Sequence, residues 1–302
     1  MLRPHTTVIH VVSLFRRFGV YALEYYPCCT KSIRTELNTV LLAFIRTTLS
    51  QTIKTGTAPG RKMRRLMPHK VADAIQQFNA PGPKPNGLQA ADDGLWIIDQ
   101  GNSHIYKVDW SSGAILHDVP TDTVHSSGIT LGGGYIWVAS TYSCEMFQIE
   151  IETGKTVEKY PSPGAGINAT REHLDADAGR KSQPTGDHGL EWKDGDLYIA
   201  SPPSQFVHIV DTNNWQEIGR MKVPGFRVHG LAWAAEEGHV WIADTAFGVV
   251  SRHRLEDGRC YDAFRVVDPI QVHGMTIKEN RLWYADDRGP IGFLDVDMEP
   301  SF

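Results

Sequence analysis

The sequence has few cysteines, no long apolar run and no excess of basic residues. Only 4 of its 302 residues are cysteine, and none forms a CxxC pair, which excludes a thiolate zinc module and a dense disulfide framework. No run approaches the roughly 20 apolar residues that a membrane-spanning helix needs. A net charge of −5 argues against a nucleic-acid-binding protein. We therefore expect neither a membrane nor a nucleic acid as a partner.

Several catalytic motifs are also missing. The sequence has no GxSxG, P-loop or HExxH pattern and no GxGxxG motif after a strand. Serine hydrolysis, phosphoryl transfer from ATP and Rossmann dinucleotide chemistry therefore lack support. The composition, 41% apolar and 22% charged, is that of a soluble globular protein. Isolated cysteines and the lack of a convincing leader make the cytoplasm the default location.

The charge of the chain changes sign near residue 66. Residues 1–66 contain eleven Lys or Arg and two acidic residues, whereas residues 67–302 contain 19 basic and 33 acidic residues. A break this sharp indicates a domain boundary. Three interpretations of the basic segment remain open: a targeting segment, an accessory helical segment, or an over-long start ahead of Met63 and Met67, which we favour. Residues 67–302 are predicted to form the folded domain.

A repeat runs through this domain. Five segments combine a glycine and an apolar residue, a turn, and an aromatic strand that ends in Asp or Ser. They are NGLQAADDGLWIID (86–99), SGITLGGGYIWVAS (127–140), HGLEWKDGDLYIAS (188–201), HGLAWAAEEGHVWIAD (229–244) and HGMTIKENRLWYAD (273–286). Their glycines are 41, 61, 41 and 44 residues apart, and the long interval contains an insertion at about 165–187. The insertion is predicted to be a loop that covers the site described below.

Each repeat predicts a four-stranded β-propeller blade. Apolar residues alternate with period two, and the segments are separated by glycine-rich turn signals. The fifth repeat ends after its third strand, whereas 71–82 (VADAIQQFNAPG) resembles a fourth strand ahead of the first repeat. We predict an all-β fold, a propeller of five four-stranded blades in which the N-terminal strand completes the last blade. A sixth blade built from residues 1–66 is the alternative.

The Gly–apolar…aromatic–Ala–Asp rhythm, as in His229–Asp244, resembles the superfamily of small-molecule β-propellers. That group includes senescence-marker/gluconolactonase-like, NHL-repeat, streptogramin-lyase-like and plant-type glutaminyl-cyclase-like proteins. The resemblance covers about residues 70–298 and implies the fold more than the activity. No single family matches closely. For example, plant-type glutaminyl cyclases carry Glu where this chain has Ser127, and gluconolactonase-like enzymes have a Glu/Asn/Asp calcium site of which only Asn86 is suggestive here.

The residue before each repeat glycine is the main candidate for chemistry. These residues are Asn86, Ser127, His188, His229 and His273. In a propeller this position begins the innermost strand, so the side chains of different blades converge near the axis. We predict a divalent metal site, with Zn, Fe, Mn, Cu or Ni all compatible, formed by His188, His229 and His273 with His125 or Asn86. A metal-free lining of capping histidines is the alternative.

Three further residues are predicted to act at the same end of the propeller. Glu191 lies three residues after His188 where the other repeats have uncharged residues, so a raised pKa and a general-base role are expected. Arg227 suits an anionic substrate, because its guanidinium group matches two oxygens. Tyr142 follows the second strand of its repeat. The alternatives are an ion pair with a neighbouring blade for Glu191 and a solvated rim for Arg227.

These residues predict a metal-dependent lyase or hydrolase that acts on a small polar or anionic molecule in the central funnel. A non-catalytic propeller that binds a protein or ligand is one alternative. An iron- or copper-dependent oxidoreductase with the same histidines is another. The sequence does not determine the substrate or the oligomeric state.

Overall fold

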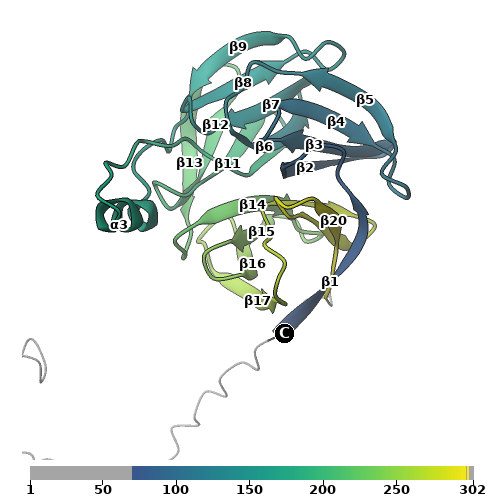
Figure 1. The fold of residues 1–302 in the computed structure, drawn as a ribbon. Coiled ribbons are helices and arrows are strands. Elements are labelled where there is room, and N and C mark those ends of the chain that lie inside the picture. The colour runs from purple at the N-terminus through teal and green to yellow at the C-terminus, as the bar shows by residue number, and fades with distance from the viewer. Residues whose placement is uncertain (1–69, 297, 299–302) are drawn as a thin grey trace, which may run out of the picture. The chain divides into compact units, whose positions relative to one another are not determined.

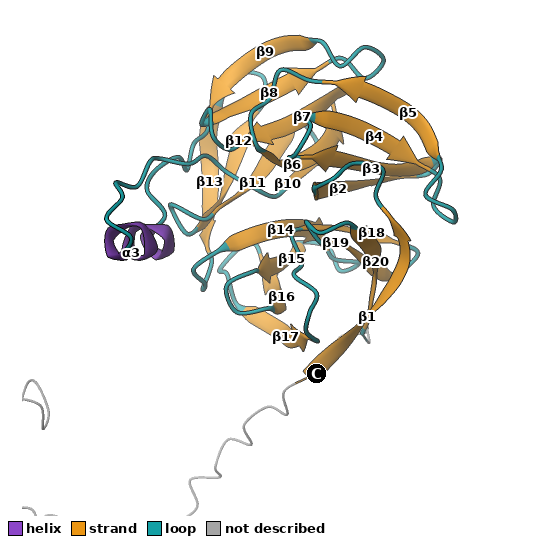
Figure 2. Cartoon of the chain, in the orientation of Figure 1, coloured by secondary structure: helices purple, strands orange, loops and turns teal. Residues whose placement is uncertain are grey.

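A computed structural model describes residues 70–296 and 298 (Figure 1). The chain divides into two units, Met1–Leu66 and Met67–Phe302. The interpretations of residues 1–66 given above fall outside the described residues and stay predictions. Almost all regular structure in the described part is strand, and helix α3 (Ala169–Asp177) lies among the loops (Figure 2). No helix of the described residues is long and apolar enough to cross a membrane.

Three antiparallel four-stranded sheets follow one another along the chain. In each sheet the strands pair in chain order, because short turns join neighbouring strands. The first sheet contains β2 (Pro85–Ala91), β3 (Gly94–Asp99), β4 (His104–Val108) and β5 (Ile115–Pro120). The second contains β6 (Ser126–Gly132), β7 (Tyr135–Ser140), β8 (Glu145–Ile149) and β9 (Thr156–Pro161). The third contains β10 (Leu190–Lys193), β11 (Asp196–Ser201), β12 (Phe206–Asp211) and β13 (Gln216–Lys222).

The remaining strands form one eight-stranded sheet in the order β14-β15-β16-β17-β1-β20-β19-β18. Its strands are β14 (Val228–Trp233), β15 (His239–Asp244), β16 (Val249–Arg254), β17 (Cys260–Val266), β18 (Gly274–Lys278), β19 (Arg281–Ala285), β20 (Pro290–Asp295) and β1 (Lys70–Asn79). β1 pairs antiparallel with β20 from Asp73 to Asn79, and parallel with β17 from Lys70 to Ala72. The first described strand therefore joins the last strand of the chain.

The first strands of the five repeats surround a common axis. Each repeat glycine lies against the carbonyl oxygen of the residue that precedes the next repeat glycine. The pairs are Gly87 with Ser127, Gly128 with His188, Gly189 with His229, Gly230 with His273 and Gly274 with Asn86. The closest approach is at Gly128, where a Cβ atom would lie 1.8 Å from the carbonyl oxygen of His188. Glycine is needed here because any side chain would push two backbones apart.

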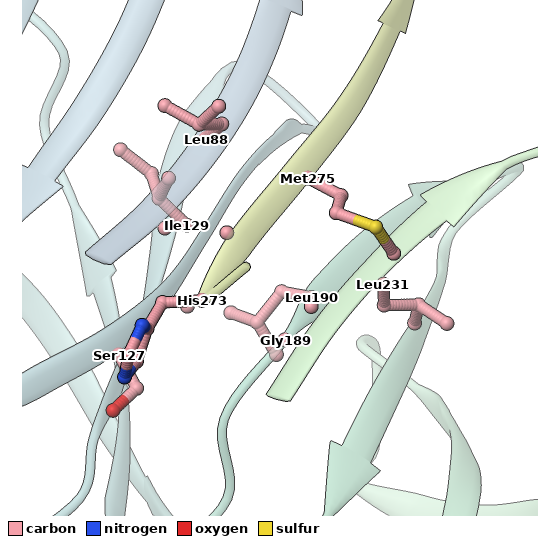
Figure 3. Close-up of a pocket in the computed structure, with 12 residues that line it drawn as sticks. Leu88, Ser127, Ile129, Gly189, Leu190, Leu231, His273 and Met275 are labelled. Carbon is pink, nitrogen blue, oxygen red and sulfur yellow. The ribbon is translucent and has the colours of Figure 1, made fainter. Parts of the chain in front are cut away.

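Apolar side chains occupy the axis below the glycines. Leu88, Ile129, Leu190, Leu231 and Met275 line a cavity of about 10 Å³ there, as Figure 3 shows. A volume of that size holds at most about one water molecule. The axis is thus filled at this level.

The hydrophobic core lies between neighbouring sheets. One cluster joins Trp96 of β3 to Ile136 and Phe147 of the second sheet, and another joins Trp137 of β7 to Leu197 and Ile199 of the third. The aromatic residue of the second strand of each repeat is buried or half-buried: Trp96, Trp137, Tyr198, Trp241 and Trp283. These large side chains fill the wedge between adjacent sheets, which fixes the position of the inner strands.

The insertion at 165–187 contains structure that the sequence analysis treats as loop. Helix α3 spans Ala169–Asp177. Asn168 precedes it, and Asn is a favoured residue at a helix N-terminus. The two ends of the insertion are joined by a backbone bridge between Gly166 and Thr185.

Candidate functional site

Three histidines from consecutive repeats come together where the inner strands begin. His188 is 9% exposed, His229 2% and His273 3%. The ring centroids of His188 and His229 are 4.0 Å apart, and those of His229 and His273 are 4.7 Å apart. Pairing of Ser126 with Ser140 and of Val228 with Asp244 puts this end of the inner strands beside the end of each second strand. We call this end of the domain the mouth.

The hydrogen bonds of the three rings restrict their tautomers. Nδ1 of His273 lies 3.2 Å from the carbonyl oxygen of Gln271, which only accepts, so this nitrogen carries a proton. The Nε2 of a neutral His273 therefore holds a lone pair. Nδ1 of His188 lies 3.2 Å from Nδ1 of His229. In the absence of an ion, one of these two nitrogens donates to the other.

The histidines are neutral at pH 7. Burial lowers the pKa of His188, His229 and His273, and for His188 and His229 the pKa lies well below the ordinary value of 6.5. The positive charge of Arg227 lowers all three values further, because the imidazolium form of each ring is repelled. Neutral imidazole is the form that binds a metal ion or accepts a proton.

Two buried polar atoms among the residues that precede the repeat glycines lack hydrogen-bond partners. Among the described residues, the buried Oδ1 of Asn86 and Nε2 of His229 have no hydrogen-bond partner. Leaving a buried polar atom unpaired costs about 1–3 kcal/mol. Both atoms belong to residues that precede a repeat glycine, so the mouth contains two of the buried polar atoms without a partner in the described residues.

The spacing of the His188 and His229 nitrogens bears directly on the predicted metal site. Two nitrogens that bind one tetrahedral ion at about 2.0–2.1 Å are about 3.3 Å apart. The observed 3.2 Å between the two Nδ1 atoms matches that distance. Within the described residues, however, no group of three or more His, Cys, Asp or Glu side chains has the arrangement of a complete metal centre. The separation of these two nitrogens is thus that of two ligands of one ion, and the described residues hold no complete set of ligands around them.

His125 and Tyr142 lie at the edge of the mouth. Their rings stack with centroids 3.9 Å apart and an interplanar angle of 7°. Charge on His125 would also lower the pKa of His188 and of His229, which indicates that its ring is near theirs. Arg227 is exposed and immediately precedes β14, and the backbone carbonyl of Arg227 accepts the amide of Thr245.

Glu191 is deeper in the domain than the histidines. Its Oε1 accepts the backbone amide of Trp233 in the next inner strand at 3.1 Å. The hydroxyl of Thr276 makes the corresponding bond to the amide of Ala90 at 2.9 Å. Burial raises the pKa of Glu191 to about 8, so the side chain is protonated at pH 7. Through this bond Glu191 connects its own inner strand to the next one.

The acidic residues that end the second strands bind turn amides. Asp99 accepts the amides of Lys84 and Gly101, and Asp244 accepts those of Phe226 and Ala246. Asp286 follows the same pattern. Such Asp side chains stabilise the loops of the mouth. Asp287 lies beside a mouth histidine, with its Oδ2 4.0 Å from Nε2 of His273.

One buried carboxyl group is not among the site residues predicted from the sequence. Asp187 directly precedes His188, is fully buried, and its pKa is raised to about 6 by that burial. It accepts the amide of Gly164, at the other end of the insertion, at 3.4 Å. The repeat pattern does not single it out, because Asp187 lies before the repeated segment and two repeats, not one, end their second strand with Ser.

Comparisons with known proteins identify the fold. No family model and no curated protein matches the chain. Among solved structures, Myxococcus xanthus glutaminyl cyclase aligns with a TM-score of 0.57 and 10% identity, covering 76% of this chain and 98% of that chain. A streptogramin B lyase aligns with a TM-score of 0.45 and 16% identity, covering 74% of this chain and 97% of that one. At such identities only the fold is shared. The chain is an all-β propeller protein, as its repeats predict.

Proposed function

We propose that the domain is a five-bladed propeller, with β1 as the outer strand of the last blade. Two observations support this count. The glycine–carbonyl contacts connect five inner strands in a closed circle. In addition, the eight-stranded sheet divides into two sets of four where β17 meets β1, since β1 is parallel to β17 and antiparallel to β20. Antiparallel pairing is the rule within a blade.

We further propose that the mouth is the active site of a metal-dependent lyase or hydrolase. The observation that carries this proposal is the 3.2 Å separation of two Nδ1 atoms on neutral, buried imidazoles. His188 and His229 would hold the ion, and His273 would add its Nε2. His125 or the unpaired Oδ1 of Asn86 would complete the donor set. The ion would supply Lewis acidity and a lowered pKa for water.

The remaining residues of the mouth suit a small polar or anionic substrate. Arg227 supplies a positive charge within electrostatic reach of all three histidines. Tyr142 supplies a hydroxyl group at the edge of the site. A general-base role for Glu191 stays a prediction, and the bond from the Trp233 amide favours a structural role. The proposal includes no nucleic acid or membrane as partner, and a cytoplasmic location.

Metal content tests the proposal. Full-length protein would be purified without affinity metals, incubated with a mixture of Zn²⁺, Mn²⁺, Ni²⁺, Cu²⁺ and Fe²⁺, desalted and measured by mass spectrometry of the elements. We expect about one ion per chain in the wild type and less than about a tenth of that in His229→Gln, since a ligand is removed. His104→Gln is the matched control, because His104 pairs with Asp118 of the outer strand β5 and with none of the three histidines.

The same measurement separates the alternatives. Equal metal content in the wild type and in His229→Gln would exclude this site, and no metal in either would exclude metal dependence. Selective retention of iron or copper would favour the oxidoreductase. A non-catalytic ligand-binding propeller is the second candidate, and the exposed aromatic side chains around the mouth favour it. That candidate predicts that ligand binding tolerates Gln at all three histidine positions.

A further inference from the structure

The exposed aromatic side chains of the described residues all lie at the mouth. They are Tyr142, Phe226 and Phe247, which are 46%, 50% and 56% exposed. Tyr142 follows the end of β7, Phe226 precedes β14, and Phe247 follows the end of β15. Exposed aliphatic side chains are instead common on outer strands, for example at Ile115, Val157 and Ile218. Exposed aromatic surface is thus confined to the side of the domain that carries the histidines.

Phe226 and Phe247 are in contact, and hydrogen bonds hold the backbone of both residues in place. Their rings meet edge to face with centroids 5.5 Å apart. The carboxylate of Asp244 accepts the backbone amide of Phe226 at 2.8 Å and that of Phe247 at 3.3 Å, so one buried side chain fixes both residues. Asn168 of the insertion approaches the carbonyl oxygen of Phe226 at 3.5 Å. Two phenyl rings held in this way present a preorganised apolar surface to solvent.

Arg227 joins this apolar surface to the histidines. It lies between Phe226 and Val228, and the next residue is His229. The positive charge of Arg227 contributes to the lowered pKa of His188, His229 and His273, and the backbone carbonyl of Arg227 accepts the amide of Thr245, beside Asp244. Along one loop the mouth therefore offers an aromatic surface, a cation and a reactive centre in that order.

From this order we infer the substrate class: a small molecule that joins an aromatic ring to an anionic group such as a carboxylate. The ring packs on Phe226 and Phe247, and the anion pairs with Arg227. The inference rests on the proposed function, because it places the bond to be broken beside the histidines. The exposed aromatic surface of the mouth comprises three side chains, far less than the roughly 800 Å² that each partner contributes to a stable protein interface. A small molecule is therefore the occupant that fits.

Three matched probes test the inference by isothermal titration calorimetry on the full-length protein. They are 3-phenylpropionate, propionate, which lacks the ring, and 3-phenylpropan-1-ol, which lacks the charge. We expect 3-phenylpropionate to bind at least about 5-fold more tightly than either of the others, since an aromatic contact contributes about 0.5–1.5 kcal/mol. Equal binding of 3-phenylpropionate and propionate, or no binding of any probe, would overturn the inference.

Variants locate the two contacts. Phe226→Ala with Phe247→Ala should lower the affinity for 3-phenylpropionate to that for propionate, and Arg227→Gln should lower it to that for the alcohol. Ile218→Ala, which removes a comparably exposed apolar side chain from β13, should change nothing. Circular dichroism would verify that each variant is folded. Unchanged affinity in the folded double variant, or in Arg227→Gln, would show that the probe binds elsewhere and would contradict the inference.

Two further readouts separate this inference from the metal proposal and from a second copy as occupant. The metal content of the Phe226→Ala, Phe247→Ala variant should equal that of the wild type, because neither phenyl is a ligand. Probe binding through Phe226 and Arg227 in a protein that binds no metal would refute the proposed function and leave the inference standing. If sedimentation velocity detected a wild-type dimer that the double variant no longer forms, the phenyl pair would be assigned to self-association. That result would refute the inference.

Discussion

His188 and Glu191 lie three residues apart at the start of the same inner strand, yet the structure gives them different tasks. The ring of His188 contacts another imidazole, and its neighbours at the mouth include two unpaired polar atoms. The carboxyl group of Glu191 accepts the amide of the adjacent inner strand, as the hydroxyl of Thr276 does elsewhere in the domain. Both have strongly shifted pKa values because both are buried. A shifted pKa therefore marks burial, and only the partners distinguish a reactive group from a structural one.

The repeat glycines should tolerate substitution less well than any other positions along this axis. Gly128→Ala puts a Cβ atom 1.8 Å from a backbone oxygen of the next repeat, so the inner strands must separate. We expect a loss of more than about 4 kcal/mol in the free energy of unfolding, or no soluble protein. Gly166→Ala is the control, since its Cβ atom meets nothing closer than 3.6 Å. Urea denaturation measures both, and equal stability of the two variants would contradict the closed circle of strands.

Glu191→Gln should distinguish the carboxyl group of Glu191 from the histidines of the mouth. The pKa of Glu191 is raised from 4.5 to about 8, so the folded state binds its proton more tightly than the unfolded state. Its contribution to stability is present below about pH 4.5 and is lost as the pH rises through about 8. The amide of Gln keeps the acceptor for Trp233 and does not ionise. We expect the variant to be more stable than the wild type at pH 9 by on the order of 2–4 kcal/mol.

The measurement is urea denaturation at several pH values. Glu191→Leu provides the contrast, because it leaves the Trp233 amide without its acceptor and should be less stable than Glu191→Gln at every pH by about 1–3 kcal/mol. If Glu191→Gln instead left the pH dependence unchanged and abolished turnover, Glu191 would belong with the histidines as a catalytic group.

The repeat pattern is enough to predict where the histidines lie, whereas the partner of Glu191 depends on contacts between strands. The glycine spacing suffices to predict that His188, His229 and His273 converge, because equivalent positions of repeats meet at one axis. The partner of Glu191 depends on the stagger of two neighbouring strands, which no feature within one repeat specifies. The helix at Ala169–Asp177 was missed because its polar sequence has no apolar face with helical spacing. Asp187 was missed because it stands outside the repeated pattern.

The pH dependence of metal binding should sharpen the contrast between buried and ordinary histidines. Because burial holds the pKa of His188 and His229 well below 6.5, these two rings stay deprotonated as the pH falls to 6.5. Zn²⁺ affinity, measured by competition with a chelating dye, should then be constant between pH 8 and 6.5 apart from the dye's own titration, and should fall about 10-fold or more only at lower pH. A decline that begins above pH 7 would mean that the ligands are exposed imidazoles elsewhere.

The smallest effect is expected from the acidic residues of the mouth loops. Asp244→Asn leaves one oxygen to accept amides and should cost about 1 kcal/mol in urea denaturation. Its Zn²⁺ affinity should stay within about 2-fold of the wild type, because Asp244 binds turn amides. A 10- to 100-fold loss of metal affinity would instead identify Asp244 as the residue that orients a ligand histidine.

Anomalous diffraction from crystals grown with Zn²⁺ tests the central claim most directly, because it locates the ion without any knowledge of the substrate. Data collected above and below the zinc absorption edge would be compared for the wild type. The account predicts one strong peak within about 2.1 Å of Nδ1 of both His188 and His229. A mouth with no peak, while the two rings keep their mutual contact, would contradict it.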